Sequence, residues 1–303
     1  MICRILPGIA LLGIALGFAP GAFAQQVKDA PLRVGMAKTF FNDVPEVLIG
    51  IATEPFPKLM KQTTGLEGVL TTSDGAFEVA RKLNANELQI GVFHGHELAW
   101  AQKKYPNLTP LMIVTNKLHD VRVYIIVPAK SSVKSMADLR GKNFDLPLGS
   151  KEHTVVYVNK HGCNNNLSKI DAYFGKVTRA KNPNVALDSL CSCDCGALAV
   201  DSIALDYYKS INGPRFDRNL RVLQESDPFP QPVLAYIPGK VSGATIEQFR
   251  KGLLTAHELP TGREMMDMWK IDRFNDVPAT YGKSLADVLK RFPLPEPTKV
   301  SAR

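Results

Sequence analysis

The segment with the clearest capacity for binding chemistry is GSKEHT at residues 149–154. It follows a short apolar strand pattern, and Ser150 stands where the N-cap of a new helix is expected. The first amides of a helix have no partner inside it and lie at the positive end of its dipole. With the Ser150 hydroxyl, Lys151 and a protonated His153, they could donate charge-assisted hydrogen bonds to an oxyanion. A capped helix that binds nothing is the alternative, and these residues alone leave both interpretations open.

A second polar pair, His94 and His96, follows the apolar run LQIGVF. The His-x-His spacing is compatible with metal binding, but two histidines are too few for a closed site, and Glu97 is the only further candidate nearby. Histidines on a loop after a strand can instead line a binding cleft or serve as structural residues. All three interpretations remain open from the spacing.

The N-terminal segment has the three parts of a secretory signal. Arg4 is its single basic residue, residues 9–18 form an apolar core, and the small-residue sequence AFA precedes Gln25. A Pro-Gly pair ends the apolar run before it reaches the length of a membrane span. We therefore expect export, cleavage near Gln25, and no other transmembrane segment.

Cysteines in the mature part of the chain are unusually clustered, with three in the sequence LCSCDCG. An even number of cysteines in an exported protein favours disulfides. The alternating spacing differs from the Cys-x2-Cys of common zinc sites, although four thiolates could also hold zinc or copper(I). We expect a structural disulfide rather than a metal site, and its candidates are Cys163, Cys191, Cys193 and Cys195.

Enzyme signatures are missing from the sequence. It contains no Gly-x-Ser-x-Gly elbow, no phosphate-binding Gly-x4-Gly-Lys-Ser/Thr loop, no His-Glu-x-x-His and no dinucleotide fingerprint. The net charge of +8 is spread along the 303 residues without a Lys/Arg run, which is not typical of a nucleic-acid interface. The sequence thus favours a binding protein with no catalytic residues, no cofactor and no nucleic-acid partner.

Short strand patterns alternate with helical patterns along the mature chain, beginning at residues 32–37 and 88–93. This alternation predicts an α/β fold. Two strand patterns at residues 108–116 and 121–128 are separated by four residues, and a second pair lies near residue 225. The restart after the first pair indicates two similar lobes, and the second pair indicates that the chain crosses back.

Several segments, in order and at this spacing, carry a family resemblance: LRVGMAKTF, ELQIGVFHGHELAWA, SMADLRGKNFDLPLGS, GALAVDSIALDYYK and LRVLQESDPFPQPVLAYIPG. Through them the chain resembles the substrate-binding proteins of bacterial ABC importers. Within that group it is similar to the phosphate/phosphite/phosphonate-binding branch of the type 2 periplasmic binding fold. The resemblance covers essentially the whole mature chain.

The resemblance implies a two-lobed α/β fold, with two mixed sheets flanked by helices and joined by a two-strand hinge. We expect a signal peptide at 1–24, a first part of lobe 1 at 25–119, lobe 2 at 120–228, a return to lobe 1 with C-terminal helices at 229–292, and a loose tail at 293–303.

The resemblance also implies ligand-binding residues after the strands of both lobes. A run of Ser and Thr at the second-lobe helix is usual for the phosphonate branch, whereas here Lys-Glu-His lies between two hydroxyl residues, which leaves the anion open. The aromatic candidates could instead be core, and Asp201 could simply cap a helix. The implied set is Thr39, Phe40, Phe41, Phe93, His94, His96, Ser150, Lys151, His153, Thr154 and Asp201.

From these features we expect an exported, periplasmic, monomeric solute-binding component of an ABC importer. It would bind a phosphonate, phosphite or phosphate-like anion between its lobes without catalysis and deliver it to an inner-membrane permease. One alternative is a receptor for a sulfonate or another organic anion. The other is an exported metal- or redox-active protein that uses the cysteines and the His-x-His pair.

Overall fold

The computed structural model describes residues 30–42, 44–116, 121–163, 170–192 and 196–294, and the fold is given for these. The predicted signal peptide and nearly all of the predicted tail lie outside the described residues.

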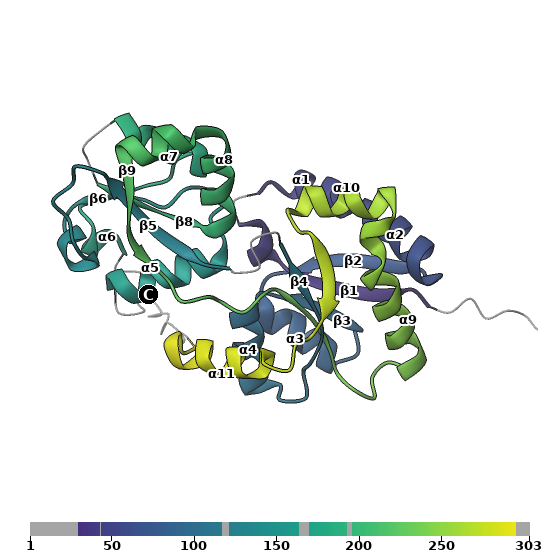
Figure 1. The fold of residues 1–303 in the computed structure, drawn as a ribbon. Coiled ribbons are helices and arrows are strands. Elements are labelled where there is room, and N and C mark those ends of the chain that lie inside the picture. The colour runs from purple at the N-terminus through teal and green to yellow at the C-terminus, as the bar shows by residue number, and fades with distance from the viewer. Residues whose placement is uncertain (1–29, 43, 117–120, 164–169, 193–195, 295–303) are drawn as a thin grey trace, which may run out of the picture. The chain divides into compact units, whose positions relative to one another are not determined.

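The first sheet has six strands in the order β11-β4-β10-β3-β1-β2. β1 pairs in parallel with β2 and β3, which are labelled in Figure 1. β10 runs antiparallel to β3 and β4. β3 is buried along its whole length, which fits the continuous apolar run in the sequence. The strands are β1 (Leu32–Ala37), β2 (Gly68–Ser73), β3 (Ile90–Phe93), β4 (Thr109–Thr115), β10 (Val233–Tyr236) and β11 (Arg273–Asp276).

The second sheet has five strands in the order β7-β6-β8-β5-β9. β6 is parallel to β7 and β8, and β5 is antiparallel to β8 and β9. Both sheets are therefore mixed, as predicted. The strands are β5 (Val123–Pro128), β6 (Asn143–Asp145), β7 (Lys176–Thr178), β8 (Ala197–Asp201) and β9 (Leu220–Glu225).

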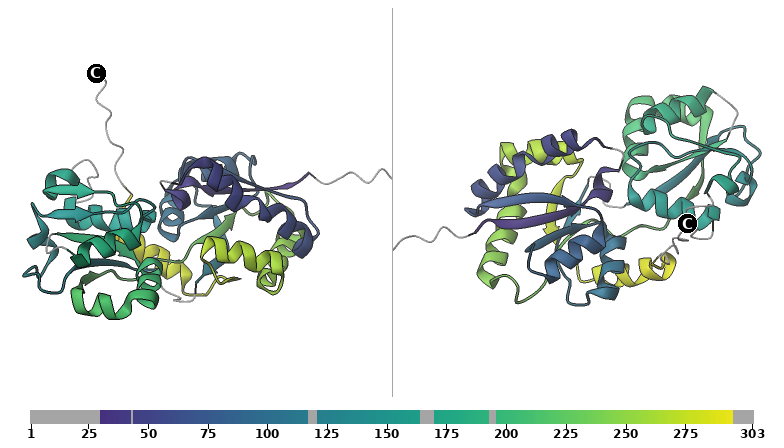
Figure 2. Two further views of the ribbon diagram at one scale, coloured as in Figure 1. Left: turned by 90° about the horizontal axis from the view of Figure 1, so that it is seen from above. Right: turned by 180° about the vertical axis from the view of Figure 1, so that it is seen from behind.

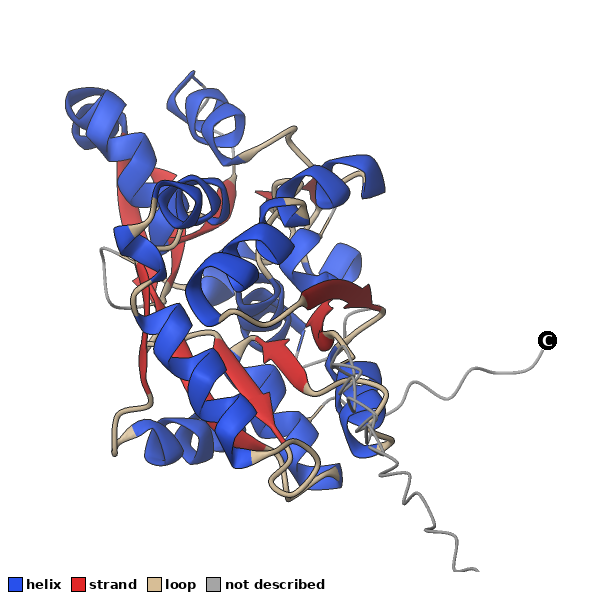
Figure 3. Cartoon of the chain, turned by 90° about the vertical axis from the view of Figure 1, so that its right-hand side faces the viewer, coloured by secondary structure: helices blue, strands red, loops and turns tan. Residues whose placement is uncertain are grey.

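Helices surround the strands of both sheets (Figure 3). In the second sheet's part of the chain they are η2 (Met136–Leu139), α5 (Glu152–Cys163), α6 (Ile170–Tyr173), α7 (Pro183–Ser192) and α8 (Ser202–Asn219). In the remainder they are η1 (Lys38–Phe41), α1 (Glu46–Thr53), α2 (Pro55–Thr64), α3 (Ala76–Asn84), α4 (Gly95–Lys104), α9 (Gly243–Leu254), η4 (Ala256–Glu258), α10 (Pro260–Trp269) and α11 (Tyr281–Arg291).

The C-terminal helix α11 packs against α4 (Figure 2). The buried side of α11 includes Tyr281, Leu285 and Val288, at the spacing of one helix face. Trp100 of α4 donates its indole N–H to the carbonyl oxygen of Phe292 at 2.8 Å, just after α11. The end of the described chain is thus fixed to the helix that carries the first-sheet histidines.

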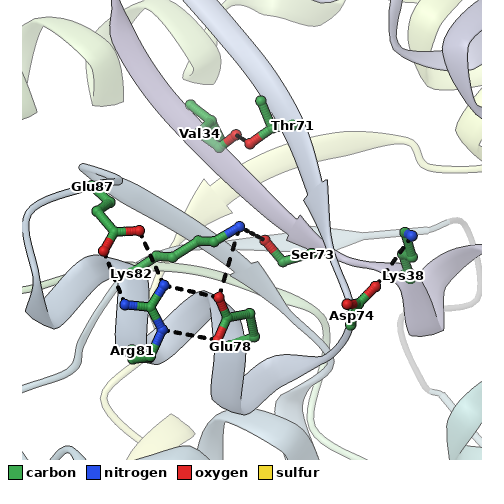
Figure 4. A network of polar contacts seen from close by, with 9 residues as sticks. All are labelled: Val34, Lys38, Thr71, Ser73, Asp74, Glu78, Arg81, Lys82 and Glu87. Atoms are coloured by element: carbon green, nitrogen blue, oxygen red, sulfur yellow. Dashed lines mark hydrogen bonds and ion pairs between the residues drawn. The ribbon is translucent and has the colours of Figure 1, made fainter.

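α3 shows how amphipathic helices attach to the first sheet. Its apolar side is buried, and its outer side carries Arg81, which contacts the carboxylates of Glu78 and Glu87 at 2.9 Å (Figure 4). Lys38 of η1 contacts Asp74 at 3.2 Å, immediately before α3. These exposed ion pairs contribute little stability each, but the Lys38–Asp74 pair links η1 to the β2–α3 connection.

The chain passes between the sheets twice, from β4 to β5 and from β9 to β10. The two connecting segments run antiparallel at one bridge, where the Phe229 amide donates to the Val121 carbonyl at 2.8 Å. Nearby, the Val123 amide donates to the Ser226 hydroxyl at 2.9 Å. The predicted double crossing is therefore present as a paired connection, while the predicted domain boundaries and hinge motion stay predictions.

Candidate functional site

A cavity of about 100 Å³ lies where chain segments after the strands of both sheets meet. One group of lining residues follows β1 and β3, another belongs to the start of α5 and the end of β8, and a third comes from the crossing segments. Six of the eleven predicted site residues line it: Phe40, His94, His96, Lys151, His153 and Asp201.

The two first-sheet histidines owe their position to the turn from β3 into α4. His94 is the N-cap residue of α4, and its backbone N–H donates to the Glu97 carboxylate at 3.2 Å. Between the histidines, Gly95 leaves room for the second crossing segment: a Cβ there would lie 2.5 Å from the carbonyl oxygen of Pro230. Only glycine permits this approach without a shift of the backbone. The glycine between the two histidines is therefore required for packing, while the histidines supply the imidazoles.

A third imidazole, that of His153 from α5, completes a histidine cluster with His94 and His96. Their exposed fractions are 6%, 5% and 1%, in that order. The ring centroid of His94 lies 5.7 Å from that of His96 and 6.1 Å from that of His153. Phe40 stacks on His94 at 3.8 Å, and Phe229 contacts the other two rings at 5.8 and 5.6 Å. The resemblance implied that all three histidines belong to one ligand site, and the structure adds the distances between their rings.

Burial favours the neutral form of all three imidazoles in the histidine cluster. Burial lowers the pKa of His96 to about 3 and that of His153 to about 3, and it places the pKa of His94 well below its ordinary value. Because charging an imidazole in a buried place removes its hydration, the uncharged form is favoured. The Nε2 atom of each ring is buried and finds no hydrogen-bond partner in the part of the chain that the structure describes.

The start of α5 differs from the prediction in its cap. The helix begins at Glu152, and the Lys151 carbonyl accepts the first helical hydrogen bonds, from the amides of Thr154 and Val155. Ser150 is buried, and its hydroxyl donates to the Pro147 carbonyl at 2.7 Å. The prediction that Ser150 caps the helix is wrong, because its hydroxyl is used within the preceding turn.

Side chains at this helix start connect it to the η1 region. The Lys151 ammonium donates to the carbonyl oxygen of Phe40 at 3.2 Å. The Asn42 amide donates to the Glu152 carboxylate at 3.1 Å, and burial raises the pKa of that carboxyl. Glu152 is therefore held by Asn42 and is not a lining residue of the cavity.

Asp201 combines the two roles that the sequence left open. It is the N-cap of α8, and its carboxylate accepts from the Ala204 amide at 2.8 Å. It also lines the cavity, and burial raises its pKa. Being a helix cap therefore does not remove it from the site.

Five predicted residues do not line the cavity: Thr39, Phe41, Phe93, Ser150 and Thr154. Phe93 and Thr154 are fully buried, and Phe93 belongs to the hydrophobic core. Phe41 packs against a second hydrophobic cluster, which includes residues of β1 and α2. Thr39 lies in η1 and is partly buried. Because consecutive residues point in different directions, a loop that contributes one residue to a site usually places its neighbours elsewhere.

Several lining residues were missed by sequence reasoning. They lie at the end of β4, in the crossing segments, just after Asp201, and at the end of α10. The repeated strand pairs were the only signal for the crossing segments, and nothing local marked the end of α10. The missed residues are Val114, Thr115, Asn116, Val121, Ser202, Ile203, Phe229, Pro230, Pro232, Trp269, Lys270 and Ile271.

Of the four cysteines predicted as disulfide candidates, only Cys191 has a described side chain. Cys191 is a free thiol in this structure, and its sulfur lies 3.7 Å from the Tyr208 hydroxyl. Cys193, Cys195 and the side chain of Cys163 lie outside the described residues, and their pairing stays a prediction. Over the described ranges, no group of three or more His, Cys, Asp or Glu is arranged to hold a metal ion.

Comparisons with known proteins show the family of this chain. The profile of the family described as "ABC transporter, phosphonate, periplasmic substrate-binding protein" matches residues 50–281, which is more than half of the chain. The chain belongs to this family. Its members are substrate-binding components of transporters and generally lack catalytic activity. No protein with curated annotation matches the sequence.

Solved structures agree on the fold. The binding protein component of an ABC phosphonate transporter from Pseudomonas aeruginosa is 13% identical with a TM-score of 0.58, and 86% of each chain is covered. PhnD1 from Prochlorococcus marinus, solved with methylphosphonate, is 13% identical with a TM-score of 0.57, covering 86% of this chain and 97% of that one. A Xanthomonas citri protein bound to ATP gives the same identity, TM-score and coverage. This likeness confirms the type 2 periplasmic binding fold.

The search for membrane spans gave a negative result for the described part of the chain, where no helix is both long and apolar enough to cross a bilayer.

Proposed function

We propose that this chain is the exported solute receptor of an ABC importer, and that its cavity binds a small phosphonate, phosphite or phosphate-like anion without changing it chemically. The observation that carries the proposal is the meeting, around one cavity, of Lys151 with three imidazoles whose Nε2 atoms have no partner among the described residues. These are the donors that an oxyanion requires.

The dimensions and the helix at the site agree with this class of ligand. About 100 Å³ is several times the roughly 10–15 Å³ that a single water molecule needs, so the cavity has room for a small polyatomic anion. The first turn of α5 adds amides without partners inside the helix and the positive end of the helix dipole. PhnD1, which shares the fold, was solved in complex with methylphosphonate, and this supports testing phosphonates first.

Binding without turnover is the direct test. Methylphosphonate, phosphite, phosphate, sulfate and methanesulfonate would be compared by thermal shift and isothermal titration calorimetry, each with analysis of the recovered ligand. An anion at 100 times its Kd stabilises the folded protein by about 2.7 kcal/mol, which raises Tm by roughly 5–10 °C. No shift with any phosphorus oxyanion would contradict the proposal, and a response to methanesulfonate alone would reassign the ligand to the sulfonates.

A matched pair of variants ties the binding to the cavity. Lys151→Met removes an ammonium that lines it, whereas Lys130→Met removes the same charge at an exposed position. Losing a charge-assisted hydrogen bond costs about 1.5–3 kcal/mol, so Lys151→Met is expected to weaken binding roughly 10- to 100-fold. Equal affinities for the two variants would place the anion elsewhere.

Export, cleavage near Gln25 and delivery to an inner-membrane permease are parts of the same proposal. They are supported by the signal pattern at the N-terminus and by the family to which the chain belongs. The N-terminal residue of protein recovered from the periplasm would test the first two directly. A mature protein that still carries residues 1–24 would contradict cleavage.

A further inference from the structure

The histidine cluster makes the cavity unusual for an anion site, because its most buried donors carry no charge before the ligand arrives. All three imidazoles are at least nine-tenths buried and line the same cavity. Each has a buried Nε2 atom without a hydrogen-bond partner within the described ranges. An imidazole nitrogen without a proton presents a lone pair to an anion, and protonation turns that nitrogen into a donor.

Fixed charges around the cluster do not balance a dianion. Among the described residues, the lining cations are Lys151 at the start of α5 and the exposed Lys270 after α10, and Asp201 at the cap of α8 is a lining carboxyl. Two further carboxyls do not line the cavity: Glu97, which is buried, and Glu152, which is partly buried, and burial raises the pKa of both. Because Lys270 is exposed, Lys151 is the one lining cation of the described residues that is partly buried. A phosphonate or phosphate dianion beside it would leave buried negative charge, which is costly unless further positive charge is supplied.

We propose that the histidine cluster supplies this charge by taking up protons from solvent as the anion binds, so that His94, His96 and His153 determine which anions the cavity accepts and at which pH. The inference rests on the proposed function of the cavity. In this step a proton moves from water or buffer to an imidazole nitrogen, the resulting N⁺–H donates to an anion oxygen, and no bond of the anion is broken.

The magnitudes are compatible with such an uptake. A single opposite charge within about 4–6 Å changes a pKa by roughly 1–3, and a dianion carries two. The pKa of His153 starts at about 3, against an ordinary value of 6.5. A bound dianion can therefore return at least one imidazole to the neutral range of pH. Repulsion between like charges on rings whose centroids lie 5.7 and 6.1 Å apart favours protonation of one ring over protonation of all three.

Isothermal titration calorimetry measures how many protons the protein takes up when the anion binds. Methylphosphonate would be titrated into the full mature protein at pH 7 in imidazole, triethanolamine and Tris, because sulfonate buffers resemble candidate ligands. The slope of the observed heat against the buffer's ionisation enthalpy gives the protons taken up per bound anion. His153→Gln and the triple variant His94→Gln/His96→Gln/His153→Gln remove titration and keep a polar atom in place, and His257→Gln is the control outside the cavity.

The wild-type protein and His257→Gln are expected to take up at least about half a proton more per anion than the triple variant. Their Kd is also expected to rise about three- to tenfold per pH unit between pH 6 and pH 7, more steeply than in His153→Gln. Tight binding by all proteins with the same proton number would overturn the inference and leave the proposed function standing. Absence of binding by the wild-type protein would overturn both. If the triple variant does not fold, the proton uptake of the wild-type protein is compared with that of His153→Gln instead, and equal uptake would overturn the inference.

Discussion

The buried carboxyl of Glu97 gives a sharp prediction about stability and pH. Glu97 lies in the first turn of α4, is 3% exposed, and accepts the backbone N–H of His94 at 3.2 Å. Burial raises its pKa from 4.5 to about 8. The folded protein therefore keeps this proton up to about pH 8, whereas the unfolded chain releases it near pH 4.5.

The sign follows from proton linkage. Between the two pKa values the folded state binds more protons than the unfolded state, so the free energy of unfolding decreases as pH rises. Each pH unit in this window is worth about 1.4 kcal/mol, and the full interval from 4.5 to about 8 is worth at most about 5 kcal/mol. Roughly 4 kcal/mol of this is lost between pH 5 and pH 8.

Glu97→Gln removes the titration and keeps an oxygen that can accept from His94, as glutamine does at this position of a capping box. We expect the variant to match the wild-type protein near pH 5 and to exceed its Tm at pH 8 by on the order of 10 °C. Urea unfolding from pH 5 to pH 9 measures the difference, with Glu264→Gln on the exposed side of α10 as the control. Parallel curves for Glu97→Gln and the wild-type protein would refute the reasoning.

Two other predictions concern packing and the cysteines. Gly95→Ala places a methyl group 2.5 Å from the Pro230 carbonyl oxygen, so we expect the free energy of unfolding to fall by about 1–3 kcal/mol and anion binding to weaken. The control Gly50→Ala, in open space on α1, should raise the free energy of unfolding by about 0.5–1 kcal/mol. Equal effects of the two variants in urea unfolding would contradict the packing argument. Cys191→Ser should change stability by less than about 1 kcal/mol because the thiol is free, and a loss of about 2–5 kcal/mol under oxidising conditions would show that it forms a disulfide.

Local patterns predicted most of the long elements. β1 and β3 are apolar runs bounded by polar residues, and α11 has apolar residues at helical spacing, so periodicity alone identifies them. The patterns gave no indication of β7 and β11, which are three and four residues long. Such strands hold too few residues for a periodic signal, and neighbouring strands determine their pairing.

The site was predicted in part for the same reason. His94 and His96 lie directly after a buried strand, where ligand contacts concentrate in α/β folds, and the structure places both at the cavity. Ser150 was selected because its residue type suits a helix cap, but its hydroxyl finds an acceptor in the turn before it. Competing hydrogen-bond partners are decided by backbone geometry, which residue type alone does not fix.

The sequence by itself determined the alternation of strands and helices, the two crossings of the chain and the family, because these depend on periodicity and on ordered motifs. The tertiary structure decided how closely the rings of His153 and His94 approach, that the crossing segment packs on Gly95, and that all three imidazoles are buried, which favours their neutral form. Charge in this cavity depends on burial, and burial arises only when segments far apart in the chain are brought together.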